Sequence, residues 1–311
     1  EGIHPEYLIN FLNACEKAES EIHGIMIARH GKVIFEGYNA PYAADIPHIM
    51  HSFTKILTNT AVALAYDDGL LKLEDPVLKY FPEYEADANE YLRACTIRNM
   101  ITMRNGQQRS IGGNEWRPLK TSWKEAYFRV PFDKKPGETY MYSSGNSYIL
   151  SYIVQKLEGK TCRELVQERV GKEIGLNDFP WMLSPEGVCS GGNGVSLTTE
   201  DMLRIGLLYL NKGKWNGKQL VPEGWIERMT TMQFEKSMDA SNPDWEDWKC
   251  GYGFQVWMCQ IPNTFRFDGM FGQFGIVLKD YDASVVTTCG EAYTEAVLRL
   301  VWKYLVPAMK G

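Results

Sequence analysis

The chain has 311 residues, of which 44% are hydrophobic and 23% charged, which is the composition of a globular protein with a large core. Its net charge of −6 and the lack of a basic patch argue against nucleic acid as a partner. No run of 18 apolar residues occurs, so we expect no membrane span.

The cysteines and histidines carry predictions about compartment and metal. Seven scattered cysteines without a Cys-x-x-Cys pair predict reduced, mostly buried thiols, which favour a reducing compartment. Residues 1–10 lack a signal-peptide pattern, so we expect a cytoplasmic rather than an exported protein, although the chain does not begin with Met. All five histidines fall within residues 1–51, without metal-ligand spacing, and we expect them on the surface or in loops. We expect no metal and no cofactor.

The first predicted elements are a helix and a hairpin. Apolar residues recur at helical spacing over 5–18. Two strand-like runs at 24–29 and 33–38 flank a short turn and predict a β-hairpin. A further helix is expected over 52–67, and Gly69 ends it.

The rest of the chain is first helical and then rich in strands. Further helices are predicted over 97–103, 146–157, 161–170 and 199–210. A glycine-rich loop at 190–194 is expected to be either flexible or of positive φ. Strands are predicted at 251–258, 264–267, 275–279 and 284–288, with a hairpin turn at 280–282 and a closing helix over 291–305.

These elements predict an α/β (α+β) fold class. Strand runs at both ends of the chain can join one antiparallel sheet, flanked by the N- and C-terminal helices. We expect an α/β lobe (about 1–70 and 215–311) and an inserted, mainly helical lobe (about 71–214). The helix that begins at Ser52 would start at the seam between them, where clefts tend to lie.

Ser52-Phe53-Thr54-Lys55 is the only Ser-x-x-Lys in the chain. A serine hydroxyl needs a base beside it, and residues three apart on a helix share a face, so Lys55 can reach the Ser52 oxygen. The unpaired N–H groups and positive dipole of a helix N-terminus favour a neutral lysine. The alternative is a surface pair, as most such pairs are. Neighbours on a helix point about 100° apart, which argues against His51 as the base.

Two other segments can contribute to the same site. Tyr142 stands at a loop-to-helix junction, and beside a lysine its phenol pKa would fall, which would make it a general base. The alternative is a packed aromatic ring. In the segment 268–273, two glycines three apart indicate a close backbone approach. An N–H there, facing that of Ser52, would complete an oxyanion hole, and the alternative is a plain hairpin with a bulge.

Three motifs resemble those of the serine β-lactamase and penicillin-binding-protein-like superfamily. They are Ser52-Phe53-Thr54-Lys55, Tyr142-Ser143-Ser144 and Gly269-Met270-Phe271-Gly272-Gln273. The closest likeness is to the class C β-lactamase-related branch, with its esterases, D-aminopeptidases and oligoamide hydrolases. The resemblance covers nearly the whole chain and implies a single β-lactamase/transpeptidase-like domain over 1–311.

The resemblance implies a role for each motif. Ser52 would be the acylated nucleophile, and Lys55 would take its proton or tune Tyr142 to do so. Tyr142 would protonate the leaving group and later activate water. The backbone N–H groups of Ser52 and Met270 would bind the oxyanion. Weaker substrate contacts are implied for Ser144, Asn146, Phe267, Gly269 and Phe271.

Two departures from the family pattern affect the expected substrate. Ser144 stands where asparagine is usual, so an amide contact is replaced by a hydroxyl or moved to Asn146. Phe267 stands where a Lys or His would pair with a β-lactam carboxylate, which disfavours penicillin turnover. The aromatic residues Trp245, Trp248, Tyr252, Trp257 and Phe271 would either wall the pocket or belong to the core. Asp244, Glu246 and Asp247 are expected in a solvated acidic loop, with attraction of a cationic group as the alternative.

We therefore predict a serine hydrolase that cleaves a small ester, amide or peptide-like substrate through a Ser52 acyl-enzyme. One alternative is a true β-lactamase or D,D-peptidase, which needs a carboxylate anchor. The other is a non-catalytic binding or sensor domain that keeps the fold. The sequence does not predict the oligomeric state.

Overall fold

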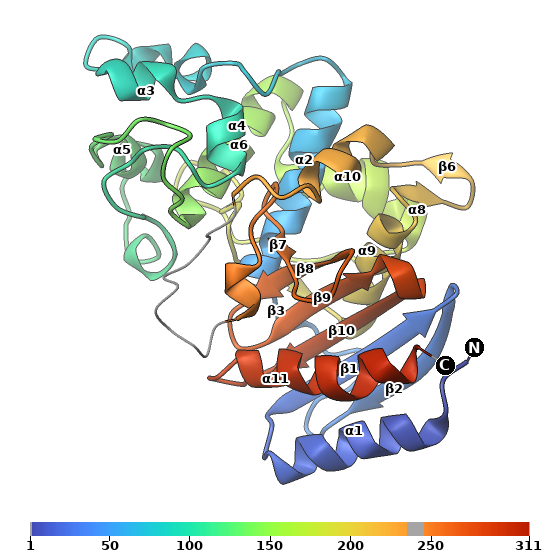
Figure 1. Cartoon of the computed structure of the whole chain (residues 1–311). Helices are drawn as coiled ribbons and strands as arrows, with labels where there is room; N and C mark the ends of the chain where they lie inside the picture. The colour runs from blue at the N-terminus through green and yellow to red at the C-terminus, as the bar shows by residue number, and fades with distance from the viewer. Residues whose placement is uncertain (1, 235–245, 311) are drawn as a thin grey trace.

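A six-stranded antiparallel sheet lies at the centre of the computed structural model, which describes residues 2–234 and 246–310 (Figure 1). The first hairpin pairs with the last strand, so the two ends of the chain meet in one sheet. This arrangement confirms the predicted fold class. In spatial order the strands are β2 (Lys32–Tyr38), β1 (Ile22–Arg29), β10 (Ala283–Cys289), β9 (Gln273–Leu278), β8 (Thr264–Gly269) and β7 (Trp257–Met258).

Helices from the two chain ends cover one face of the sheet. There α1 (Pro5–Lys17) lies beside α11 (Glu295–Leu300) and the turns that follow it, η8 (Val301–Leu305) and α12 (Val306–Ala308) (Figure 1). Their apolar sides pack on the strands, and the buried side chains include Phe11, Ile25, Ile276, Val285 and Leu298. All eight residues of β1 are buried because helices cover both faces of that strand.

The helix α9 (Thr199–Leu210) covers the opposite face of the sheet. Its N-terminus is closed by a capping box, in which Thr198 and Asp201 bind each other's backbone N–H groups. Beyond it, α2 (Lys55–Asp67) packs on α6 (Ser144–Glu158) and α7 (Cys162–Val166), and every residue of α2 from Lys55 to Ala65 is buried. A helix that is buried all round is held rigidly, which fixes the residues at its start.

Short elements complete the fold. The other helices are α3 (Glu90–Ala94), α4 (Ile97–Ile101), α5 (Trp123–Phe128), α8 (Lys172–Ile174) and α10 (Glu223–Met229). Two strand pairs lie apart from the main sheet: β3 (His48–Ile49) with β4 (Ser196–Leu197), and β5 (Lys214–Trp215) with β6 (Lys218–Gln219). Single turns are η1 (His51–Thr54), η2 (Val77–Tyr80), η3 (Pro82–Tyr84), η4 (Gly113–Glu115), η5 (Gln167–Gly171), η6 (Asp247–Lys249) and η7 (Lys279–Tyr281).

Most predicted elements are present, and two need correction. Of the strand predicted at 251–258 only β7 forms, because the chain before it is irregular: Gly251 has φ 105°, and a Cβ on Gly253 would lie 1.9 Å from the Met229 carbonyl oxygen. The closing helix begins at Glu295 rather than at residue 291. The division into two lobes near residues 70 and 215 stays a prediction.

The cysteines are reduced and mostly buried, as predicted, but one histidine is not where it was expected. All seven cysteines are free and five are buried. The reducing compartment stays a prediction. His23 is buried in β1, where its ring lies 2.8 Å from His48 and stacks on Tyr42, so it is neither a surface nor a loop residue. Over the described part of the chain, no helix combines the length and apolar character that crossing a membrane requires.

Candidate active site

The Ser-x-x-Lys motif lies where the sheet meets α2. Ser52 is in the 3₁₀ turn η1 and not in the α-helix itself, which begins at Lys55. Met50, the residue before η1, donates its N–H to the Val195 carbonyl oxygen at 2.8 Å, and Phe53 within the turn is completely buried. These contacts fix the turn. Lys55 Nζ lies 3.0 Å from Ser52 Oγ, which confirms the predicted reach of the lysine.

Burial makes the Lys55 amine much easier to deprotonate than an ordinary lysine. Only 1% of the residue is exposed, and burial lowers its pKa to about 7, against the opposing charge of Asp268. Its Nζ lies 3.1 Å from Ser144 Oγ and 2.8 Å from the Gly192 carbonyl oxygen. A deprotonated amine can donate to these two oxygens and accept the Ser52 hydroxyl proton with its lone pair.

Two adjacent glycines bring the Gly192 carbonyl oxygen to Lys55. Gly191 has φ 68°, and a Cβ there would lie 2.3 Å from the Ser147 carbonyl oxygen. A Cβ on Gly192 would lie 2.7 Å from the Ser144 side chain. The loop can therefore press against the start of α6 only because both residues lack a side chain. The sequence indicated the positive φ, but it carried no signal for the role of the Gly192 carbonyl.

Tyr142 faces Ser52 from the loop before α6. Its ring stacks on Trp257 with a centroid distance of 5.7 Å, and Lys55 Nζ lies 4.7 Å from the tyrosine ring centroid. Burial raises the pKa of Tyr142 above its ordinary value, and a hydrogen bond with Ser52 offsets only part of this effect. The predicted fall in its pKa is therefore wrong. Tyr142 is therefore a neutral phenol at neutral pH and is not poised to act as a base.

The third motif approaches the nucleophile through a glycine. A Cβ on Gly269 would lie 2.3 Å from the Met50 carbonyl oxygen, which confirms the predicted close backbone approach. Gln273 Nε2 then donates to the carbonyl oxygens of Met270 (3.1 Å) and Cys289 (2.7 Å) and braces the turn after β8. The oxyanion hole formed by the N–H groups of Ser52 and Met270 stays a prediction.

Two predicted substrate contacts belong to the core instead. Asn146 is completely buried and bonds to Asn105 and Tyr127, because it lies on the side of α6 that faces α4. Phe267 is 1% exposed and packs edge-on against Phe53, since alternation along β8 turns it away from the face that carries Asp268. Ser144 lies within reach of Lys55, as described above.

A pocket of about 310 Å³ opens beside Ser52. Trp248 and Trp257 line it, whereas Tyr252 is buried beside it and Phe271 packs edge-on against the His51 ring. Trp245 and Asp244 lie outside the described residues. The remaining lining residues are Ser52, Tyr142, Asp268, Met270, Ala292, Tyr293, Thr294 and Glu295. Sequence reasoning missed the acids Asp268 and Glu295, because nothing in the local pattern showed that they are buried.

Asp247 also differs from its prediction. It is completely buried rather than solvated, and it accepts hydrogen bonds from Trp302 Nε1 at 2.6 Å and Gln260 Nε2 at 2.9 Å. Its neighbour Glu246 is exposed, as expected for the loop.

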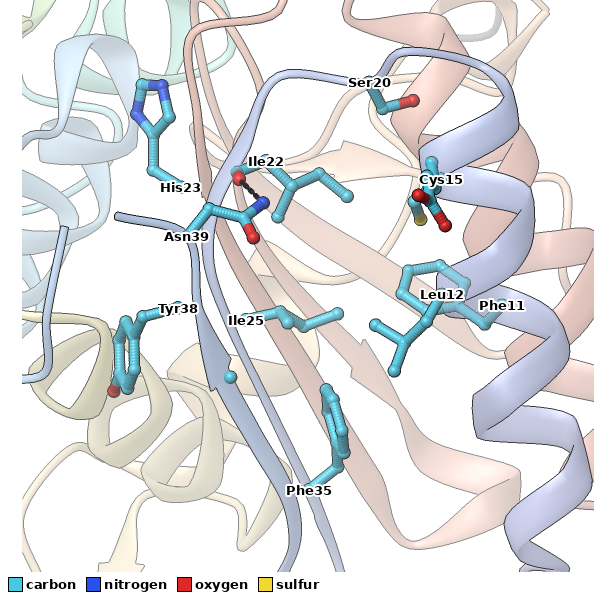
Figure 2. Close-up of a pocket in the computed structure, with 12 residues that line it drawn as sticks. Phe11, Leu12, Cys15, Ser20, Ile22, His23, Ile25, Phe35, Tyr38 and Asn39 are labelled. Carbon is cyan, nitrogen blue, oxygen red and sulfur yellow. Dashed lines mark hydrogen bonds between the residues drawn. The ribbon is translucent and has the colours of Figure 1, made fainter. Parts of the chain in front are cut away.

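A second hollow, of about 460 Å³, lies between α1 and the β1–β2 hairpin (Figure 2). Phe11 and Leu12 from α1 face Ile25 and Phe35 from the hairpin, so its walls are largely apolar. Burial raises the pKa of its one thiol, Cys15, to about 11, which leaves that group protonated and unreactive at neutral pH. Within the described ranges, no three His, Cys, Asp or Glu side chains lie close enough together to hold a metal ion.

The fold and the order of the three motifs are those of the serine β-lactamase and penicillin-binding-protein superfamily. The chain belongs to the Beta-lactamase family, whose model matches residues 12–305. It is 26% identical over 223 residues to the 6-aminohexanoate-dimer hydrolase of Paenarthrobacter ureafaciens, a match that covers 65% of this chain and 55% of the relative. The D-alanyl-D-alanine-carboxypeptidase/endopeptidase AmpH of Escherichia coli is 23% identical, with 60% and 53% covered. The chain thus spans about half the length of these two relatives.

Solved structures share the fold. A provisionally named 6-aminohexanoate-dimer hydrolase from Bacillus anthracis superposes with a TM-score of 0.79 at 19% identity. The match covers 96% of this chain and 81% of that one.

Proposed function

We propose that this protein cleaves an ester or amide through an acyl-enzyme on Ser52. The observation that carries the proposal is the 3.0 Å separation of Lys55 Nζ and Ser52 Oγ, in surroundings that lower the lysine pKa to about 7. A neutral amine at this distance can remove the hydroxyl proton at the moment when the oxygen attacks a carbonyl carbon. The names of the two curated relatives favour an amide or peptide-like substrate.

The proposed reaction has two steps. Ser52 Oγ bonds to the carbonyl carbon while its proton passes to Lys55, and the N–H groups of Ser52 and Met270 bind the oxyanion. Tyr142 gives its proton to the leaving alcohol or amine, and the proton held by Lys55 replaces it. A water molecule then attacks the acyl-enzyme and gives a proton to the neutral Lys55. Lys55 passes this proton to Ser52 Oγ as the ester bond breaks, and the acid is released.

Tyr142→Phe tests the assignment of the proton donor. A nitrophenolate leaves without protonation, whereas an amine must be protonated as it departs. We therefore expect the variant to lose roughly 100-fold or more in kcat on a p-nitroanilide but less than about tenfold on the matching p-nitrophenyl ester. Equal losses on both substrates, measured in steady state, would contradict a role in leaving-group protonation.

The β-lactamase or D,D-peptidase alternative needs a cation for the substrate carboxylate. Phe267, at the usual position of that cation, lies in the core, and the pocket contains the carboxylates of Asp268 and Glu295. A carboxylate-bearing substrate would be repelled there.

A substrate panel decides between these functions. Short-chain p-nitrophenyl esters, p-nitroanilides and a chromogenic cephalosporin would be compared at equal concentration. We expect the esters to give a burst of about one nitrophenol per enzyme, as an acyl-enzyme requires, and the cephalosporin to react far more slowly. Cephalosporin turnover near an ordinary enzymatic rate of about 10 s⁻¹ would favour the β-lactamase instead.

The binding-domain alternative leaves the buried lysine unexplained. Burying an ammonium group destabilises a fold, and a domain that only binds gains nothing from an amine with a pKa of about 7 beside a serine. Perturbed groups of this kind are typical of catalytic sites.

A further inference from the structure

A buried arginine lies behind the pocket beside Ser52. Arg266 is completely buried, and its Nε donates to Asp268 Oδ2 at 2.9 Å. Its guanidinium carbon lies 4.6 Å from the Trp248 ring centroid and 5.7 Å from that of Trp257. The arginine therefore carries the positive charge that the surrounding acids share.

The acids around the pocket outnumber this arginine. Asp268 is hydrogen-bonded to Arg266, and Asp247 Oδ1 lies 3.8 Å from Arg266 Nη1. Asp268 and Asp247 thus share the Arg266 guanidinium, and Glu295 adds a third carboxylate to the same region. About 10% of the Asp268 side chain remains exposed, and Asp268 lines the pocket.

The charge of Glu295 is only weakly compensated. It lines the pocket from the first turn of α11, it is 1% exposed, and neither carboxylate oxygen accepts a hydrogen bond from the residues that the structure describes. Its ion-pair neighbour, Arg299 Nε, is 4.0 Å away on a side chain that is 47% exposed. Burial, reinforced by Asp247, raises the Glu295 pKa to about 7. A buried carboxylate with such weak compensation destabilises the fold, and a ligand that supplies a cation reduces this cost.

We infer that the pocket binds a substrate with a positively charged group, such as an ammonium, close to the bond that is cleaved. Asp268 and Glu295 supply the opposing charge, and Trp248 and Trp257 add an aromatic wall to the pocket. This inference rests on the proposed function only in placing the scissile carbonyl at Ser52.

The chemistry of the pocket distinguishes a cation from other occupants. An ammonium group donates hydrogen bonds and accepts none, which matches the two Glu295 oxygens, since neither accepts a hydrogen bond from the described residues. An anion would be repelled, and a neutral alkyl chain would leave the charge of Glu295 weakly compensated. The volume of about 310 Å³ suits a small substrate.

The kinetic test uses pairs of substrates with the same shape and different charge. The p-nitroanilides of δ-aminovaleric acid and hexanoic acid place the cation on the acyl side. Acetylthiocholine and S-neohexyl thioacetate place it on the leaving group. We expect the cationic member of at least one pair to have a kcat/KM about tenfold or more above its neutral partner.

Variants assign the preference to the two acids. Glu295→Gln and Asp268→Asn are each expected to bring the ratio of cationic to neutral kcat/KM to within about threefold of unity. The matched control is Glu246→Gln, which removes the same charge from an exposed residue outside the pocket and should leave the ratio unchanged. Melting temperatures establish whether each variant is folded. If a variant does not fold, the cationic-to-neutral ratios of the wild type alone decide the test. Ratios at or below unity in both wild-type pairs would overturn the inference.

A binding measurement separates this inference from the proposed function. Ser52→Ala cannot be acylated, so we would titrate it with hexylammonium and with the neutral hexanol and follow tryptophan fluorescence, since Trp248 and Trp257 line the pocket. We expect hexylammonium to bind at least about tenfold more tightly, and Glu295→Gln in the same background to remove the difference. Equal affinities would reject the cation subsite even if Ser52 is the nucleophile. A difference would support it even if no ester is turned over.

Discussion

Replacing Ser52 with alanine is expected to lower kcat on every ester or amide substrate by about 10⁴-fold or more. The reason is that the Ser52 hydroxyl oxygen is the atom that would form the covalent intermediate. The measurement is steady-state turnover of the best substrate, together with the loss of the burst phase.

The matched control for this variant is Ser110→Ala. Ser110 is exposed, and its hydroxyl lies outside the pocket, so its removal should change neither kcat nor stability by a measurable amount. Ser52→Ala with more than about a tenth of wild-type kcat would reject the acyl-enzyme account.

Replacing Lys55 with methionine is expected to abolish turnover and to stabilise the fold. Activity should fall by about 10³-fold or more, because the base is lost. Stability should rise by roughly 1–3 kcal/mol at pH 6, because the buried ammonium disappears and this outweighs the loss of its three hydrogen bonds. Urea unfolding of both proteins across pH measures the second effect.

The stability gained by replacing Lys55 with methionine should depend on pH. The Lys55 pKa falls from 10.5 to about 7 on folding, so the unfolded chain binds more protons between these pH values and wild-type stability rises with pH across that window. The advantage of methionine should therefore be largest below pH 7 and smallest above pH 10.5. For the wild type, kcat/KM should rise with pH through an apparent pKa near 7, as the amine becomes neutral. A kcat/KM that falls over that range would contradict Lys55 as the base.

Residue spacing in the sequence correctly predicted two contacts of the site. A separation of three residues brings Lys55 to Ser52, and the two glycines of the third motif indicated a close approach that proves to be Gly269 against Met50. Short strand-like runs joined by turn residues predicted β8, β9 and β10, because strand propensity and turn residues are local signals.

The remaining features depend on which side chains surround a residue. The pKa of Tyr142 follows from its burial against Trp257, a partner that lies more than a hundred residues further along the chain. Asn146 and Phe267 belong to elements that were predicted correctly. However, a shift of one residue along a helix or strand decides whether a side chain faces the pocket or the core. Glu295 resembles a surface residue in an amphipathic helix, and only the packing of α11 against the sheet reveals its burial.

The most direct test of this account is intact-mass spectrometry after incubation with a fluorophosphonate probe, with wild type and Ser52→Ala side by side. The probe forms a stable bond with a serine oxygen only where a neighbouring base activates it. We predict one adduct per wild-type chain and none on the variant. An unmodified, folded wild-type chain, or an adduct that persists in Ser52→Ala, would contradict the assignment of Ser52 as the nucleophile.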